Sequence, residues 1–170
     1  MIFDLINLDK LRRGILYAAI LFGVLMVQNL LLARLPLFGV RPLFVPALMV
    51  AVGMFEGGLW GGVLGLIAGF FCDMDYAENL VLFTILFPCL GFGTGLLTER
   101  TVNRRFFSYC ILCLAALLVT ALFQAFEPVL FHGAGLFPAL RVVLIQTLWS
   151  MPFSLPLYFI AKSLSGRQLG

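Results

Sequence analysis

Charged residues are scarce in this chain, and histidine occurs only once. Asp, Glu, Lys and Arg make up 11% of the 170 residues, and the net charge is +3. A soluble domain carries roughly one quarter charged residues, because its surface faces water. The composition therefore excludes an ordinary soluble domain, and so small a positive excess does not indicate a nucleic-acid-binding surface.

The patterns of common catalytic and ligand sites are also missing. His132 stands alone in a segment rich in Gly and Pro, and Ser150 and Ser154 have no base near them in sequence. Cys110 and Cys113 form one Cys-x-x-Cys within an apolar run, without the second ligand pair that zinc requires. The glycine-rich run 91–95 lacks the context of a nucleotide-binding loop and is interpreted as a packing or kinking segment. We expect no enzymatic activity, no cofactor and no metal.

Hydrophobic residues, by contrast, are abundant. They form 62% of the chain, with 18 Phe and 17 Gly, and the mean hydropathy is +1.10. Charges and turn residues divide the chain into six apolar runs, at residues 14–33, 42–55, 57–72, 80–97, 106–126 and 142–161. We therefore predict an all-α integral membrane protein, a compact bundle of about six transmembrane helices in one polytopic domain over residues 1–170.

The lengths of the runs differ. A helix needs about 20 residues to cross the bilayer core, so the second and third runs are short. They are either full spans joined by a tight turn at Glu56 and Gly57, or a re-entrant hairpin sheltered by other helices. The last run contains Pro152 and Pro156, which should kink its helix. Residues 1–12 are expected to form a short interfacial segment before an uncleaved first span.

The distribution of Lys and Arg predicts the orientation. With six crossings, eight of these residues lie on the side of both termini, namely Lys10, Arg12, Arg13, Arg100, Arg104, Arg105, Lys162 and Arg167. The other side has Arg34, Arg41 and Arg141. The positive-inside rule then places both termini in the cytoplasm. A re-entrant hairpin would preserve this orientation but move the acidic segment 73–78 to the inner side.

Glycines recur at every fourth position of the third run. Gly57, Gly61, Gly65 and Gly69 are followed, again after four residues, by Asp73. This spacing places them on one stripe of a helix, and small residues in lipid let another helix backbone approach closely. The stripe is predicted to pack a helix, either of the same chain or of a single-span partner.

Two further groups are candidate contact residues. Trp149 and Pro152 lie together in the last run, and Gln146 in the same run is expected to make a polar contact between helices. The basic residues Arg100, Arg104 and Arg105 serve orientation, or contact anionic lipid or a cytoplasmic filament. The remaining polar residues of the spans either bond other helices or line a small pocket, and they are Gln28, Asn29, Gln124 and Glu127.

Several of these motifs together resemble the rod-shape-determining protein MreD family of bacterial inner-membrane proteins. The resemblance rests on the size, six spans and cytoplasmic termini, on Arg41-Pro42 entering the second span, and on Gly65-x-x-x-Gly69-x-x-x-Asp73. The last span, with Leu148-Trp149-Ser150-Met151-Pro152-Phe153 before Lys162, agrees as well. The segment 75–79 departs from the family, which often has a glycine-containing turn there.

The resemblance implies a function and a set of partners. It implies a non-enzymatic scaffold subunit of the cell-elongation machinery, in the bacterial cytoplasmic membrane, that positions peptidoglycan synthesis and maintains cell shape. The implied partners are a single-span MreC-like protein, an MreB-like filament, and a glycosyltransferase and transpeptidase pair, besides membrane lipid. No nucleic acid and no small-molecule substrate is expected.

An alternative function is a solute-binding membrane subunit of a vitamin-type uptake system, with Asp73, Asp75 and Glu78 serving its pocket. The spans contain few other polar groups that would recognise a polar vitamin. A membrane enzyme is a more distant alternative, because Glu56, Asp73, Asp75 and Glu127 are its only candidate acids.

Overall fold

The computed structural model describes residues 8–30, 43–76, 82–100, 105–131, 133 and 135–166. These residues form six α-helices and no strand, which confirms the predicted all-helical class. The helices are α1 (Leu8–Leu30), α2 (Val45–Glu56), α3 (Gly58–Tyr76), α4 (Phe83–Arg100), α5 (Phe106–Phe131) and α6 (Leu136–Gly166). Of the predicted interfacial segment 1–12, residues 8–12 belong to α1 and the rest lies outside the described residues.

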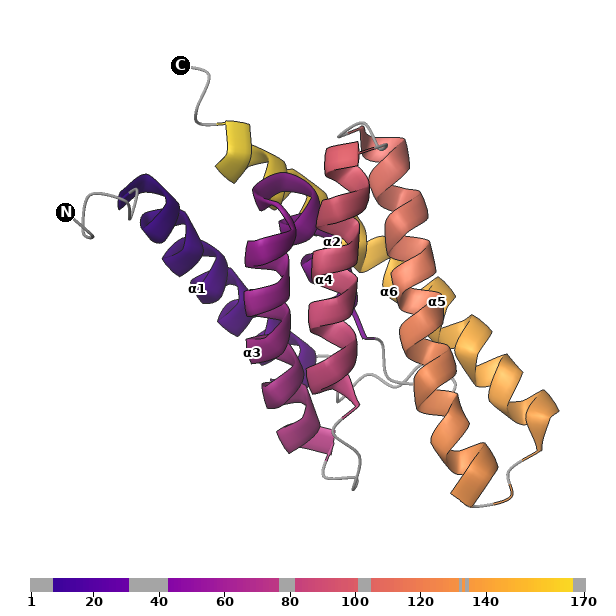
Figure 1. Ribbon diagram of the computed structural model, residues 1–170. Coiled ribbons are helices and arrows are strands. Elements are labelled where there is room, and N and C mark those ends of the chain that lie inside the picture. The colour runs from indigo at the N-terminus through magenta and orange to yellow at the C-terminus, as the bar shows by residue number, and fades with distance from the viewer. Residues whose placement is uncertain are drawn as a thin grey trace.

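Successive helices run in opposite directions (Figure 1). We call the end of the molecule at which α1 begins and α6 ends the terminal end. The turn between α2 and α3 lies at the terminal end, as do the last residues of α4 and the first of α5. At the opposite end α3 and α5 finish, and α4 and α6 begin.

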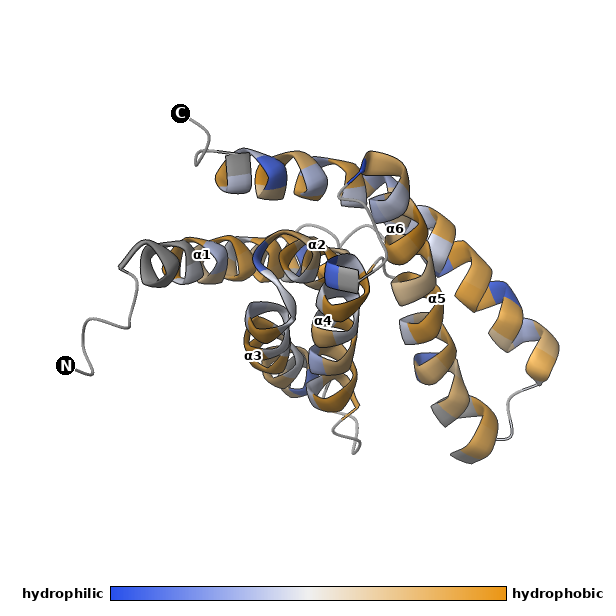
Figure 2. Ribbon diagram, turned by 45° about the horizontal axis from the view of Figure 1, so that its top comes forward, coloured by the Kyte–Doolittle hydropathy of each residue, from blue (hydrophilic) through white to orange (hydrophobic). Residues whose placement is uncertain are grey.

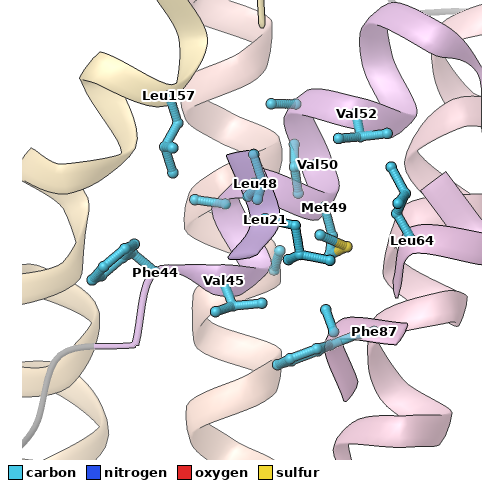
Figure 3. Packing of buried hydrophobic residues seen from close by; sticks show 14 of the residues in the cluster. Leu21, Phe44, Val45, Leu48, Met49, Val50, Val52, Leu64, Phe87 and Leu157 are labelled. Atoms are coloured by element: carbon cyan, nitrogen blue, oxygen red, sulfur yellow. The ribbon is translucent and has the colours of Figure 1, made fainter. Parts of the chain in front are cut away.

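Helix α2 is the centre of the fold. All residues from Val45 to Phe55 are buried, because the helix is apolar on every side and contacts each of the other five helices. Pro46 lies in its first turn, where the missing N–H costs no helical hydrogen bond. Figure 3 shows side chains from four other helices around α2, namely Leu21, Leu64, Phe87 and Leu157.

The other helices form two groups on either side of α2 (Figures 1 and 2). Helices α3 and α4 make an antiparallel hairpin, which α1 contacts along α3. Helices α5 and α6 make a second antiparallel pair. Because α4 and α5 contact each other little, α2 provides most of the contact between the two groups.

The hydroxyl of Tyr109 connects α5 to both α2 and α6. It lies 3.2 Å from the backbone oxygen of Ala47 and 3.1 Å from that of Ser154, and its one proton is shared between these two carbonyls. The ring of Tyr109 is fully buried and packs against Tyr158. One hydroxyl thus joins three helices at the point where the two groups meet.

The helix lengths correct several predicted boundaries. Helix α2, with 12 residues, is short as predicted, but α3 has 19 residues and continues to Tyr76 rather than ending at residue 72. Helix α5 continues past residue 126 to Phe131, and α6 begins at Leu136 rather than 142. The predicted boundaries followed charged and turn residues, and Asp73 and Arg141 instead lie within helices.

Two helices are long and apolar enough to cross a membrane, α5 over Phe106–Phe126 and α6 over Leu136–Ser165. Four shorter apolar stretches accompany them, at Gly14–Gln28, Val45–Glu56, Gly58–Met74 and Phe83–Glu99. Pro152 and Pro156 lie inside α6, and its ribbon changes direction part-way along its length (Figure 2). A proline within a helix produces such a change, since it removes a hydrogen bond and crowds the preceding turn.

Replacing Tyr109 with Phe tests the connection between the two helix groups. We expect the free energy of unfolding to fall by about 1 kcal/mol, because hydrogen bonds between helices in lipid are worth roughly 0.6 to 1.7 kcal/mol. The measurement is detergent-induced unfolding of the purified protein, followed by circular dichroism. Tyr158→Phe is the control, because no hydrogen bond of the Tyr158 hydroxyl is found within the described residues. Equal losses in both variants would contradict the role given to the Tyr109 hydroxyl.

Candidate functional site

The glycines of α3 lie against the backbone of α4. A Cβ atom added at Gly61 would lie 2.6 Å from the carbonyl oxygen of Gly91, and one at Gly65 would lie 2.6 Å from that of Phe87. At Gly69 the nearest atom would be the carbonyl oxygen of Phe83. Because these neighbours are backbone atoms that cannot rotate away, every residue larger than glycine would push the two helices apart.

Helix α4 contributes glycines to the same contact. A Cβ at Gly91 would meet the backbone of Gly61, and one at Gly95 would meet the backbone of Gly58. Gly53 of α2 faces the same region, since a Cβ there would meet the carbonyl of Gly91 and the hydroxyl of Thr94. The glycine-rich run of α4 is therefore the complement of the stripe on α3. Of the two partners considered for the stripe, the structure shows a helix of the same chain.

Gly57 is not part of the stripe, contrary to the prediction. It lies between α2 and α3 with φ of 95°, a left-handed conformation that favours glycine. A Cβ there would lie 3.3 Å from Oε1 of Glu99 and would not meet the backbone of α4. Because α3 begins only at Gly58, it is Gly58 that faces α4 at this end. The four-residue spacing alone does not show where the helix starts.

The carboxylate of Asp73 caps the first turn of α4. One oxygen, Oδ1, accepts a hydrogen bond from the backbone N–H of Phe83 at 3.0 Å. The other, Oδ2, accepts from the backbone N–H of Thr84 at 2.7 Å and from its hydroxyl at 2.6 Å. Asp73 lies within α3, so the side chain of one helix satisfies the amides at which the next helix begins.

The cap satisfies backbone N–H groups at the start of α4 that would otherwise have no partner. The first four N–H groups of a helix have no partner within that helix, and a negative charge is favourable at the positive end of the helix dipole. Where water is absent, an unpaired N–H is costly. The contacts of Gly65, Gly69 and Asp73 therefore act together, because they fix both the distance and the register of α3 along α4. The hydroxyl of Thr84 adds a third hydrogen bond to the carboxylate of Asp73. The position of Thr84 in the sequence did not indicate this role.

The two residues that immediately precede α2 are held by side chains of other helices. The side-chain oxygen of Gln28 in α1 accepts from the N–H of Phe44 at 3.3 Å. The hydroxyl of Ser150 in α6 accepts from the N–H of Leu43 at 3.1 Å and donates to the carbonyl of Gln146 at 2.7 Å. Two buried polar side chains from distant parts of the sequence thus hold the start of the central helix.

A second polar contact joins α5 and α6. The side-chain amide of Gln146 donates to that of Gln124 at 2.8 Å. Gln146 therefore makes the predicted polar contact between helices. The side chains of Asn29 and Glu127, which were also candidates for lining a pocket, lie outside the described residues.

Trp149 and Pro152 lie on α6, apart from the contact between α3 and α4. The ring of Trp149 packs edge-on against Phe153 at 5.9 Å, and Phe153 stacks on Phe44 at 5.7 Å. The indole Nε1 of Trp149 is buried and has no hydrogen-bond partner within the described part of the chain. Pro152 is exposed on the outside of α6.

The predicted basic residues lie around the connection between α4 and α5. Arg100 is the last residue of α4, and Arg105 immediately precedes α5 and is exposed. Arg104 and the side chain of Arg100 lie outside the described residues, as do the side chain of Asp75 and residue Glu78. Among the residues that the structure describes, no three His, Cys, Asp or Glu side chains come together as metal ligands would.

Comparisons with protein families, with curated proteins and with solved structures gave no match to the chain.

The glycine contact predicts that a single methyl group at Gly65 destabilises the protein. In Gly65→Ala the new Cβ would lie 2.6 Å from the Phe87 carbonyl oxygen, and overpacking of this kind costs about 1 to 3 kcal/mol. Gly93→Ala in α4 is the matched control, because a Cβ there meets nothing within 4 Å. Detergent-induced unfolding measures both, and we expect a loss in Gly65→Ala alone. A stable Gly65→Ala variant would show that α3 and α4 are not in backbone contact.

The cap predicts a graded response at Asp73. Asp73→Ala removes both oxygens, and we expect a loss of about 1 to 2 kcal/mol, which is typical for removal of an N-terminal helix cap. Asp73→Asn retains one acceptor oxygen and should lose less. Unfolding of the two variants is compared under identical detergent conditions. If Asp73→Ala and Asp73→Asn are as stable as the unchanged protein, the carboxylate does not cap α4.

Proposed function

We propose that the chain is an integral membrane protein whose six helices form one bundle in the lipid bilayer. The observation that carries this proposal is the open apolar surface of α5 and α6. Only 33% of the apolar stretch of α5 and 39% of that of α6 is buried within the chain, whereas the core helix of a soluble protein is mostly buried. The outward side chains are large and apolar, among them Phe107, Phe123, Phe126, Leu144, Leu148 and Phe159.

Helix α3 supports the same proposal, since both of its faces are apolar. Its inner face contains the glycine stripe, and its outer face exposes Leu59, Leu66, Phe70 and Met74 by 53% to 77%. A continuous apolar surface of this extent is rare on a soluble monomer. Lipid chains would cover it without cost.

The lengths of the helices fit a bilayer. At 1.5 Å per residue, the 19 residues of α3 and the 18 of α4 extend about 28 and 27 Å, close to the roughly 30 Å of a bilayer core. Helix α2 extends only about 18 Å, and because its last residue lies at the terminal end, its start lies at membrane depth. This is tolerated where the protein itself surrounds such a start and satisfies the N–H groups there, as Gln28 and Ser150 do for the two residues before α2.

We propose that the terminal end faces the cytoplasm. Lys10 lies in the first turn of α1, Arg100 ends α4, Arg105 precedes α5 and Lys162 lies in the last turns of α6, all at this end. Arg141, near the start of α6, lies toward the opposite end. An excess of basic residues favours the cytoplasmic side.

Within this membrane protein the function we propose is that of a non-enzymatic scaffold. It binds partner membrane helices in the cell-elongation machinery of bacteria and positions peptidoglycan synthesis, as the resemblance to MreD implies. The partners would be a single-span MreC-like protein, an MreB-like filament and the glycosyltransferase and transpeptidase pair. Because the glycine stripe is occupied by α4, partners that span the membrane would bind the outer faces of α1, α3, α5 and α6.

The polar side chains favour a scaffold over a solute-binding subunit. Gln28, Gln124, Gln146 and Ser150 bond each other or the backbone of neighbouring helices. They hold the bundle together, and no observation assigns them to a solute.

Depletion of the protein in its native cell tests the scaffold function. We expect rod-shaped cells to become round and to stop elongating, because wall synthesis loses its position along the side wall. Cell shape is scored by microscopy, and expression of the intact chain should restore rods. Normal shape together with a new vitamin requirement would contradict the scaffold and would favour solute uptake.

A further inference from the structure

Two exposed cations lie where the pair of α5 and α6 reaches the terminal end. Arg105 immediately precedes α5, and Lys162 lies in the last turns of α6. Because the two helices are antiparallel, the start of one and the finish of the other lie at the same end of the bundle (Figure 1). Neither side chain forms an ion pair within the described residues. The two positive charges therefore lack a compensating carboxylate there.

Aromatic rings connect these two cations. Phe106 follows Arg105 directly, and its ring centroid lies 5.1 Å from that of Tyr158. The ammonium of Lys162 lies over the ring of Tyr158, 5.8 Å from its centroid, and an aromatic face attracts a cation held there. Phe106 also stacks on Phe159 at 6.3 Å. We call these five residues the aromatic-basic cluster.

The cluster borders an apolar surface that continues away from the terminal end. Phe106 is 42% exposed and Phe159 is 62% exposed. Ile111 on α5 and Leu155 on α6 are also exposed, and they lie further from the terminal end along their helices. The outside of the α5–α6 pair is thus positively charged at its end and apolar next to it.

The hydroxyl of Tyr158 is a further hydrogen-bond donor in the cluster. Only 3% of this residue is exposed, and its ring packs against Phe55 and Tyr109 as well as Phe106. The hydroxyl of Tyr109 contacts two backbone carbonyls, whereas that of Tyr158 has no hydrogen-bond partner within the described residues. A nearly buried polar group without a protein partner calls for water or a ligand.

We propose that the aromatic-basic cluster binds one anionic phospholipid. Its phosphate would lie between Arg105 and Lys162 and accept a hydrogen bond from Tyr158, and its acyl chains would cover Phe106 and Phe159. Charged Arg and Lys donors form strong hydrogen bonds with phosphate, and basic residues at a membrane surface attract anionic lipid. This inference rests on the proposed location of the chain in the membrane.

A lipid accounts for both parts of this surface. A phospholipid presents a charged phosphate directly above apolar chains, in the order in which the cluster presents cations and then exposed Phe106 and Phe159. An acidic soluble partner would match Arg105 and Lys162 but would leave the apolar rings uncovered. The charge and the apolar surface together therefore favour a lipid.

Native mass spectrometry of the full-length protein in detergent micelles tests the inference. It measures the affinity for phosphatidylglycerol and for phosphatidylcholine with identical chains, which both carry a phosphate but differ in net charge. One Lys or Arg near a membrane surface strengthens the binding of anionic lipid about fivefold. With two cations we expect phosphatidylglycerol to bind about 25-fold more tightly. Equal affinities for the two lipids would overturn the inference.

Single variants separate the charge from the hydrogen bond. Lys162→Gln and Arg105→Gln should each weaken binding of phosphatidylglycerol about fivefold and leave phosphatidylcholine unchanged. Tyr158→Phe should weaken both lipids about fivefold, because both carry the phosphate that accepts its hydrogen bond. Unchanged binding in Tyr158→Phe would overturn the role of its hydroxyl.

Arg141→Gln is the matched control, because it removes an exposed cation of α6 toward the opposite end. It should leave both affinities unchanged. A loss as large as that of Lys162→Gln would show a general attraction of lipid to any cation and would overturn the cluster as a site. Glycerol 3-phosphate should not displace the bound lipid, since it lacks acyl chains. Displacement would assign the cluster to free phosphate esters and overturn the lipid.

Membrane insertion is measured separately from lipid binding. The test is resistance of the protein, reconstituted in vesicles, to extraction with alkaline carbonate. An extractable protein would overturn both the proposed membrane location and this inference. An inserted protein with equal affinities for the two lipids would overturn only the lipid site.

Discussion

Backbone N–H and C=O groups must find hydrogen-bond partners wherever water is excluded, and the arrangement of this fold follows from that requirement. Helices α2 and α4 begin inside the protein or at its edge, where their first amides have no helical acceptor. Asp73 supplies the acceptors for α4, and Gln28 and Ser150 supply them for Phe44 and Leu43, which immediately precede α2. Each cap comes from a different helix, so the same contacts that satisfy the backbone also fix which helices are neighbours.

The close packing of α3 against α4 and the caps at the helix starts stabilise each other. The glycines of α3 and α4 bring two backbones into contact, and Asp73 sets the register at which they meet. Helix α2 packs between this hairpin on one side and the pair of α5 and α6 on the other. Tyr109 joins that second pair to α2 through backbone carbonyls. The glycine stripe thus holds α3 against α4 within the bundle.

The sequence predicted the elements of this structure better than their ends. Apolar runs indicated six helices, and the glycine spacing indicated a close helix contact. The ends of α3 and α6 were wrong, because a charged residue was taken as a boundary, whereas Asp73 finds three donors and Arg141 is exposed within its helix. Gly57 was misplaced because a four-residue spacing does not distinguish the last turn residue from the first helical one. The glycine stripe meets α4 through contacts between residues that are distant in sequence. The spacing of the glycines within one helix carries no information about such contacts.

Backbone hydrogen exchange of the protein in lipid nanodiscs tests most directly whether caps from other helices organise the fold. The amides of Phe83 and Thr84 at the start of α4, and those of Leu43 and Phe44 just before α2, should exchange as slowly as amides in the middle of these helices, although amides at a helix start are ordinarily unprotected. The first amides of α5, for which the described residues show no side-chain cap, should exchange rapidly and provide the internal reference. Exchange at Phe83 and Thr84 as rapid as at the start of α5 would contradict the account.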